Sequence, residues 1–290
     1  MRFGWKLTDI NAAGTVEASV DAERLGYDLV WVDGSATVSA VTVAASLASV
    51  TSGLRVGVTE AVGVDHPIYL AEEAAVADLA LGGRLILGVR AAPGTEDSMP
   101  EILDLLSECA ASHPFRHAGD RWNVPAHLEQ NVFNLEDLIR VAPAPAQIEL
   151  PMWVVGAAGR DAGVERGFGF VADVAESPAD LASWWATVRS DHPKLVRRLR
   201  RTACWTPPVA NGRVVLDDAV SQLRVLQESI GLDLVLVTAD DETAADAERA
   251  GLMRSDLARH VRPLVQLDRL PPGLADHWAE AITPYRYRQP

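Results

Sequence analysis

The sequence predicts an α/β fold, a single (β/α)8 barrel of the TIM type. Short runs rich in β-branched residues alternate with longer segments rich in alanine and leucine, which is typical of strands and helices joined in βα units. Eight such units follow one another, the number that closes a parallel barrel. The 290 residues suit one domain of this kind, with residues 90–151 as an irregular excursion and residues 266–290 as a C-terminal extension.

The first half of the barrel has the clearest pattern. Its four expected strands are nearly continuous apolar runs, as strands buried on both faces are. Gly26 ends the first expected helix, because glycine readily adopts the left-handed conformation at a helix terminus. His66-Pro67 opens the third expected helix. We expect strands at residues 2–7, 27–32, 54–59 and 84–89, and helices at 15–25, before 52–53, and at 68–81.

The second half resumes after the excursion, which carries one expected helix at 99–111 and stretches rich in proline and asparagine. An excursion of this length on a barrel usually lies at one end of the strands, where loops carry function. We expect the remaining strands at residues 152–155, 170–174, 201–206 and 233–237, and their helices up to 167, at 178–189, 216–230 and 243–264.

Composition limits the partners and the compartment. The formal net charge is −14, from 40 acidic and 26 basic residues, so neither nucleic acid nor an anionic membrane is an expected partner. The chain shows no signal-peptide core and no membrane-spanning apolar run, and we expect it in the cytoplasm. Cys109 and Cys204 are expected as buried thiols, and the histidine spacing predicts no metal site.

The segment GAAGRDAG follows the fifth expected strand, at the end of the barrel where active sites lie. Its small residues leave backbone N–H groups accessible, a helix starts there, and Arg160 adds a cation, so the turn suits a phosphate group. A tight strand-to-helix turn would need glycines for steric reasons alone. The pattern leaves both interpretations open.

The segment VGVTEAVGVDHP follows the third expected strand. Ala61 and Gly63 are small enough for the backbone to approach a planar ligand closely. The segment fits equally well a plain connecting loop in which His66 caps the next helix or hydrogen-bonds locally.

Taken in order, these motifs resemble the luciferase-like monooxygenase family. AERLGYDLVWVDG is similar to its second-strand segment, and LRVGVTEAVGVDHPIYLAEEAAVADLALGGRLILGV to its unit from the third to the fourth strand. FRHAGDRWNV and PAPAQIELPMWVVGAAGRDAGVERGFGFVADV resemble the segments that lead into the fifth strand and its phosphate-binding turn. The resemblance covers residues 1–175.

The resemblance implies an oxidoreductase or monooxygenase that acts on a small organic substrate with reduced FMN, or alternatively with the deazaflavin coenzyme F420, lying across the barrel mouth. Such a protein positions the ring and the substrate and excludes water. A carboxylate becomes a candidate proton donor if it is desolvated, although most loop carboxylates are solvated. The expected catalytic carboxylates are Glu60, Asp33 and Asp9, the ring neighbours are Thr59, Glu60 and Ala61, and the phosphate ligands are Gly156, Ala157, Ala158, Gly159 and Arg160.

Two departures from the family pattern favour an alternative function. Many members have a histidine after the aspartate that ends the second strand, whereas Asp33 is followed by Gly34. Many have a glycine-rich stretch after the fourth strand, whereas this chain has GVRAAPGTED. The alternative is a catalytically degenerate barrel that acts as a ligand-binding or partner subunit.

The resemblance also implies a homodimer. Its relatives pair through helices near the second to fourth strands, and the corresponding segments VTVAASLASV and YLAEEAAVADLAL are rich in small apolar residues that allow close helix approach. The same residues would also suit helices that only face the barrel.

Overall fold

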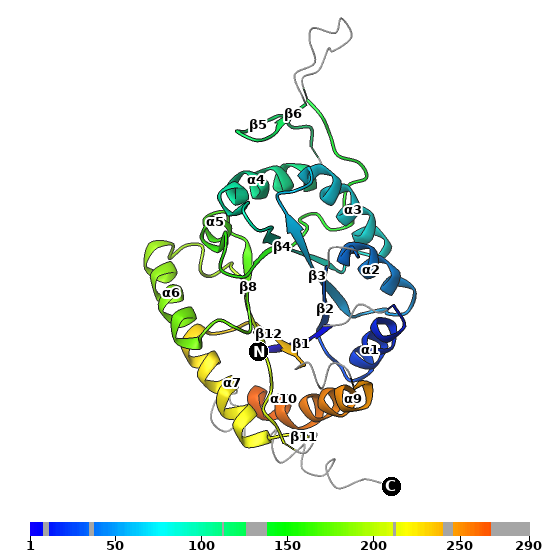
Figure 1. The fold of residues 1–290 in the computed structure, drawn as a ribbon, viewed down its shortest axis with the longest axis vertical. Coiled ribbons are helices and arrows are strands. Elements are labelled where there is room, and N and C mark those ends of the chain that lie inside the picture. The colour runs from blue at the N-terminus through cyan, green and yellow to red at the C-terminus, as the bar shows by residue number, and fades with distance from the viewer. Residues whose placement is uncertain are drawn as a thin grey trace, which may run out of the picture.

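A closed barrel of eight parallel strands confirms the predicted fold class (Figure 1). The computed structural model describes residues 1–7, 12–34, 38–111, 113–125, 138–210, 213–239 and 246–267. Around the barrel the strand order is β1-β12-β9-β8-β7-β4-β3-β2. The strands are β1 (Arg2–Leu7), β2 (Leu29–Asp33), β3 (Arg55–Val62), β4 (Leu85–Ala91), β7 (Met152–Val155), β8 (Gly169–Ala172), β9 (Arg201–Trp205) and β12 (Leu234–Thr238).

Helices surround the barrel and cover its outer face (Figure 1). None of the described helices is long and apolar enough to cross a membrane. The final helical segment is interrupted, because a π-helical stretch at Leu257–Val261 joins two α-helices. The α-helices are α1 (Ala12–Arg24), α2 (Ala40–Ser46), α3 (Pro67–Ala80), α4 (Met99–Ala110), α5 (Arg160–Glu165), α6 (Pro178–Asp191), α7 (Leu216–Ile230), α9 (Ala247–Asp256) and α10 (Arg262–Leu267), with short 3-10 turns at Leu47–Ser49 and Glu96–Ser98.

The excursion contains the expected helix, α4, and a feature that was not expected, the hairpin of β5 (His117–Ala118) and β6 (Asn123–Val124). This hairpin lies outside the helical ring, beyond α4 (Figure 1). A second small hairpin, β10 (Val209–Ala210) with β11 (Arg213–Val214), follows β9. Strands this short lack the apolar alternation from which a strand can be predicted.

Strands β3 and β4 run further than the sequence pattern predicted. The pairing Glu60↔Val89 continues through Ala61↔Arg90 to Val62↔Ala91. The continued pairing between the two strands lengthens both of them. Hydrogen bonding to a neighbour decides where a strand ends, and a polar residue such as Glu60 does not stop it. The residues that were expected to follow the third strand therefore lie within it.

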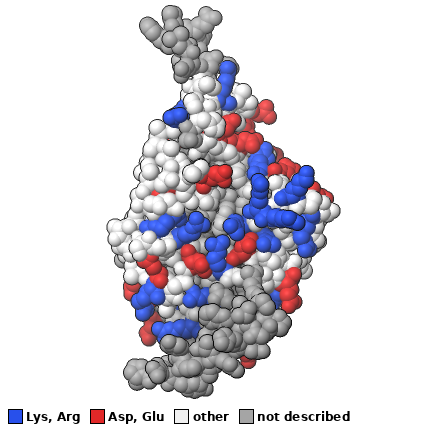
Figure 2. Space-filling model, turned by 180° about the vertical axis from the view of Figure 1, so that it is seen from behind, with Lys and Arg blue, Asp and Glu red and all other residues white. Residues whose placement is uncertain are grey.

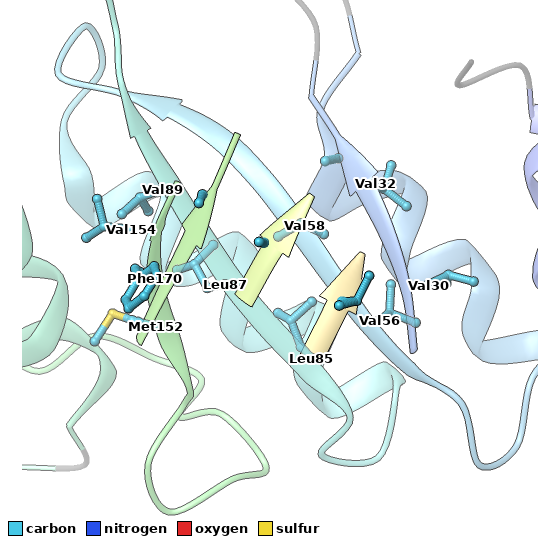
Figure 3. Packing of buried hydrophobic residues seen from close by; sticks show 14 of the residues in the cluster. Val30, Val32, Val56, Val58, Leu85, Leu87, Val89, Met152, Val154 and Phe170 are labelled. Atoms are coloured by element: carbon cyan, nitrogen blue, oxygen red, sulfur yellow. The ribbon is translucent and has the colours of Figure 1, made fainter. Parts of the chain in front are cut away.

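Two apolar clusters lie on the two faces of the barrel wall. The larger one fills the space between strands and helices, and Figure 3 shows the valines of β2 and β3 packed beside residues of β4, β7 and β8. The smaller one fills the barrel interior and consists of Leu29, Trp31, Ile86, Trp153, Val155, Val171, Cys204, Leu234 and Leu236.

Two stacked tryptophans dominate the interior. The ring centroids of Trp31 and Trp153 are 5.6 Å apart with an interplanar angle of 17°. Glycines on neighbouring strands make room for these rings. A Cβ atom added at Gly57 would lie 2.1 Å from Trp31 Cε3, and one added at Gly169 would lie 2.7 Å from Trp153 Cδ1. Both distances are far below van der Waals contact, so these positions require glycine.

Candidate active site

The C-terminal end of the barrel interior carries a cluster of four charged side chains, three from strands and one from the residue after a fourth strand. Lys6 on β1 forms an ion pair with Asp33 on β2, with Nζ 2.7 Å from Oδ2. Arg90 on β4 forms a second pair with Asp173, the residue directly after β8, with Nη2 2.8 Å from Oδ1. Lys6 alternates with the outward Trp5 and Leu7, so its side chain points into the barrel.

Several buried polar atoms of this cluster have no hydrogen-bond partner among the described residues. They are Oδ1 of Asp33, Nε of Arg90 and the hydroxyl of Thr238, which pairs with Lys6 in the sheet register. An unsatisfied buried polar group costs about 1–3 kcal/mol. A bound ligand or ordered water would remove this cost, so the unpaired atoms indicate a polar binding surface.

Cys204 lies beside the cluster, with its Sγ 3.9 Å from Lys6 Nζ. Burial, opposed only in part by the nearby Lys6, raises the pKa of the Cys204 thiol to about 11, so the thiol stays protonated at neutral pH. Burial alone would lower the pKa of Lys6, but attraction by Cys204, Asp33 and Asp173 and the hydrogen bond to Asp33 raise it overall. The Lys6 ammonium is therefore charged at neutral pH.

The three residues expected beside the ring do not share one face. Thr59 points into the barrel, where its hydroxyl accepts a hydrogen bond of 2.7 Å from Trp31 Nε1. Ala61 has the same direction by strand alternation and is exposed. Glu60 points the other way, and its Oε1 accepts hydrogen bonds of 3.0 Å from Ser39 Oγ and 3.0 Å from the Val41 N–H.

This position corrects the expectation that Glu60 lies on the face where a ring would bind. Its carboxylate instead caps the N-terminus of α2 on the outside of the barrel, an arrangement that stabilises helix ends. Asp33, the second expected carboxylate, does face the barrel mouth. Asp9 lies outside the described residues.

The turn after β7 keeps the open backbone that the sequence predicted. Ala157 and Ala158 are exposed, and the N–H groups of residues 157–159 donate no hydrogen bond within the described part of the chain. Gly156 and Gly159 have φ values of 83° and 74°, a region that favours glycine. A Cβ atom at Gly159 would also lie 2.7 Å from Met99 Cγ on α4, so the steric reason for this glycine applies as well.

Arg160 does not offer the free cation that was expected. Its Nη1 lies 2.6 Å from Glu176 Oε2, and its guanidinium stacks 4.0 Å from the ring centroid of Trp184. Only 8% of its side chain is exposed. The guanidinium thus connects α5 to α6 and to the turn after β8, while its Nε has no hydrogen-bond partner among the described residues. A partner sixteen residues away cannot be identified from the local pattern.

His66 has the local role that one of the two interpretations of its segment gave it. The His66 side chain accepts a hydrogen bond of 3.3 Å from the Ile68 N–H, so His66 caps α3. The site residues that the sequence analysis missed are Lys6, Arg90, Asp173 and Cys204. Lys6 carried a usable signal, because a lysine in an apolar strand at an inward-facing position is rare without a partner. Within the described ranges, no group of three or more His, Cys, Asp or Glu side chains is placed to hold a metal ion.

Comparison with known proteins agrees with this architecture. The family model described as luciferase-like monooxygenase matches residues 1–260. No curated protein matches the chain significantly.

Solved structures with the same fold cover almost the whole chain. The oxygenating constituent of 3,6-diketocamphane monooxygenase from Pseudomonas putida, in complex with FMN, superposes with a TM-score of 0.70 at 16% identity, covering 94% of this chain and 99% of that one. The coenzyme F420 dependent tetrahydromethanopterin reductase from Methanopyrus kandleri gives 0.70 at 14% identity, covering 91% and 99%. EDTA monooxygenase from Chelativorans sp. BNC1 gives 0.70 at 11% identity, covering 94% and 95%.

Proposed function

Because the chain belongs to the luciferase-like monooxygenase family, we propose that it is an oxidoreductase using reduced FMN, with coenzyme F420 as the alternative, on a small organic substrate. The observation that carries this proposal is the polar cluster of Lys6, Asp33, Arg90 and Asp173 at the C-terminal end of the barrel, where barrel enzymes place their active sites. The FMN complex and the F420 enzyme among its structural neighbours support the choice of cofactor.

The donors of the cluster fit a reduced ring. Both cofactors carry a pyrimidine edge with carbonyl oxygens, and this edge gains negative charge on reduction. The Lys6 ammonium and the Arg90 Nε–H supply positive charge and a hydrogen-bond donor toward the mouth. When bound, the cofactor supplies hydride or oxygen transfer, and the protein orients it and tunes its charge. Asp33, with its unpaired Oδ1, is the carboxylate that can hold or move a proton there.

The turn after β7 is the proposed phosphate site. Consecutive backbone N–H groups at residues 157–159, which donate to none of the described residues, are suited to a phosphate even without a neighbouring cation. The proposed phosphate site therefore relies on backbone N–H groups and not on the Arg160 guanidinium, which is already paired with Glu176.

Ala158→Glu tests this site better than a change at Gly159, which would disturb the contact with Met99. Ala158 is exposed, so the variant should fold normally while its carboxylate repels the phosphate. We expect the Kd of reduced FMN, or of F420, to rise about tenfold or more in an anaerobic titration. Ala186→Glu on the exposed face of α6 is the matched control and should bind as the wild type does.

The result also separates the two candidate functions. If Ala158→Glu bound the reduced cofactor as tightly as the wild type does, the phosphate would have to bind elsewhere. If neither FMN nor F420 binds the wild-type protein in reduced form, the degenerate barrel is the better description, as the engaged Arg160 and the missing histidine after Asp33 would then suggest.

We further propose a homodimer formed through α2 and α3. Three large apolar side chains of α3, Tyr69, Val76 and Leu79, are exposed by 64%, 53% and 47%. An exposed apolar helix face of this kind is typical of an interface. We expect light scattering at micromolar concentration to give twice the mass of 31.2 kDa, and Val76→Arg to give the monomer mass. A monomeric wild-type protein would contradict the proposal.

A further inference from the structure

A hollow at the N-terminal end of the barrel lies opposite to the proposed cofactor site. Two adjoining pockets of about 490 Å³ and 240 Å³ share Pro151, Trp153 and Arg200. The larger opens between the start of β7, the start of β8 and the segment before β9, and the smaller opens at the start of β1, β2 and β3. Together they form one continuous depression, which we call the basal pocket.

Positive charge is concentrated around the basal pocket although the chain as a whole is acidic. Five arginines line it, against two carboxylates, in a protein whose net charge is −14. Figure 2 views the molecule from the side opposite to Figure 1 and shows Lys and Arg side chains across the middle of that side, with Asp and Glu side chains between them. The arginines are Arg2, Arg55, Arg166, Arg198 and Arg200, and the carboxylates are Asp28 and Glu149.

Most of these guanidinium groups are not used by the fold. Arg166 is engaged with Asp104, with donor–acceptor distances of 2.6 Å and 2.8 Å. The side chains of the other four arginines form no hydrogen bond or ion pair with any residue that the structure describes. The neighbouring Arg201, by contrast, is paired with Asp233 next to the pocket. The basal pocket thus gathers four arginines without a hydrogen-bonded partner among the described residues, although Arg200 lies near enough to Asp233 to help lower the pKa of that carboxyl. This excess of cations favours an anionic ligand.

The indole of Trp153 adds a neutral donor to the same pocket. Its Nε1–H has no acceptor among the described residues, whereas Nε1 of Trp31, stacked on it, is satisfied by Thr59. Gly169 packs against this edge of the ring, and a Cβ atom there would lie 2.8 Å from Nε1, so a larger residue would cover the donor. The stacking fixes the orientation of the donor. An indole N–H can only donate, so it also calls for an acceptor.

Apolar side chains complete the lining. Ile148 stands at the rim with 99% of its surface exposed, and Leu150, Pro151 and Phe168 lie beside it. An inorganic anion would leave this apolar surface unused. A ligand with an apolar body and one acidic group would contact both parts of the pocket.

We propose that the basal pocket binds a small organic anion, an apolar body that carries a carboxylate, sulfonate or phosphate group. Arg198 and Arg200 hold the acidic group, the Trp153 N–H donates to the ligand, and Ile148 covers its apolar part. The proposal does not depend on the cofactor site, because the two sites lie at opposite ends of the barrel and share no residue.

The probe for the test is 8-anilinonaphthalene-1-sulfonate, an aromatic sulfonate whose fluorescence rises on binding. Its titration is compared for the wild type, for Arg198→Ala/Arg200→Ala and for the control Arg189→Ala/Arg259→Ala, which removes two exposed arginines outside the pocket. The neutral analogue N-phenyl-1-naphthylamine is titrated in parallel.

We expect the pocket variant to raise the Kd of the sulfonate roughly tenfold, and the control variant to leave it unchanged. Added salt should weaken binding of the sulfonate to the wild type. The neutral analogue should bind the wild type more weakly than the sulfonate does. Equal affinity of the pocket variant and the wild type for the sulfonate would overturn the proposal, and so would equal affinity of the wild type for both probes. Normal reduced-FMN binding by the pocket variant would show that the two sites are separate.

Discussion

Gly57→Ala should destabilise the protein by about 3 kcal/mol, the upper range for overpacking a core. The added methyl would lie 2.1 Å from Cε3 and 2.5 Å from Cζ3 of Trp31. Trp31 cannot move aside, because it is fully buried, stacked on Trp153 and hydrogen-bonded to Thr59. Urea denaturation monitored by circular dichroism measures the loss as a lower midpoint at unchanged slope.

Gly53→Ala is the matched control. Its new methyl would meet only Glu23 Oε1 at 3.7 Å, which is ordinary contact, so the free energy of unfolding should stay within about 0.5 kcal/mol of the wild type. Trp31→Leu in the Gly57→Ala background should lose less than the sum of the two single losses, because the smaller side chain vacates the space. Additive losses would mean that the methyl and the indole do not compete.

The barrel itself was predictable because the local sequence of each βα unit has a recognisable pattern, an apolar strand followed by a helical segment. The close packing of Trp31 on Gly57 was not predictable in the same way. It depends on the register Trp31↔Gly57 between neighbouring strands, which no single segment of sequence reveals. The small hairpin β5–β6 escaped prediction because two-residue strands have no periodicity.

The site residues named from the sequence remain predictions, and the structure shows how they are arranged. The turn at Gly156 has an open backbone, and Asp33 faces the barrel mouth. Sequence reasoning misplaced Glu60 because strand β3 continues past Thr59, and strand alternation then turns Glu60 outward. The pairing of Arg90 with Asp173, 83 residues later, requires the closed barrel and cannot be deduced from either neighbourhood.

Lys6→Met should raise the Kd of reduced FMN at least about tenfold and change that of oxidised FMN much less. The methionine keeps the length and apolar stem of the side chain but removes the buried ammonium. Two opposite charges about 4 Å apart at a partly buried site interact by about 4 kcal/mol, so even a fraction of this energy gives the expected factor. Anaerobic titration of both redox forms measures the difference, and F420 replaces FMN if it is the cofactor that binds.

Lys194→Met is the control, since Lys194 is the only other lysine and is exposed.

A second variant distinguishes the loss of the cation from the effect of leaving Asp33 without its ion-pair partner. If the cation acts on the ring, Lys6→Met/Asp33→Asn should bind reduced FMN as weakly as Lys6→Met does, whereas recovery in the double variant would mean that the unpaired carboxylate caused the loss. Because the pKa of Lys6 is raised, its ammonium stays charged through neutral pH, so a change in this difference between about pH 6 and pH 8 would come from the protonation state of the reduced ring and not from Lys6. An effect of Lys6→Met that is equal for both redox forms would contradict a role in stabilising the reduced ring.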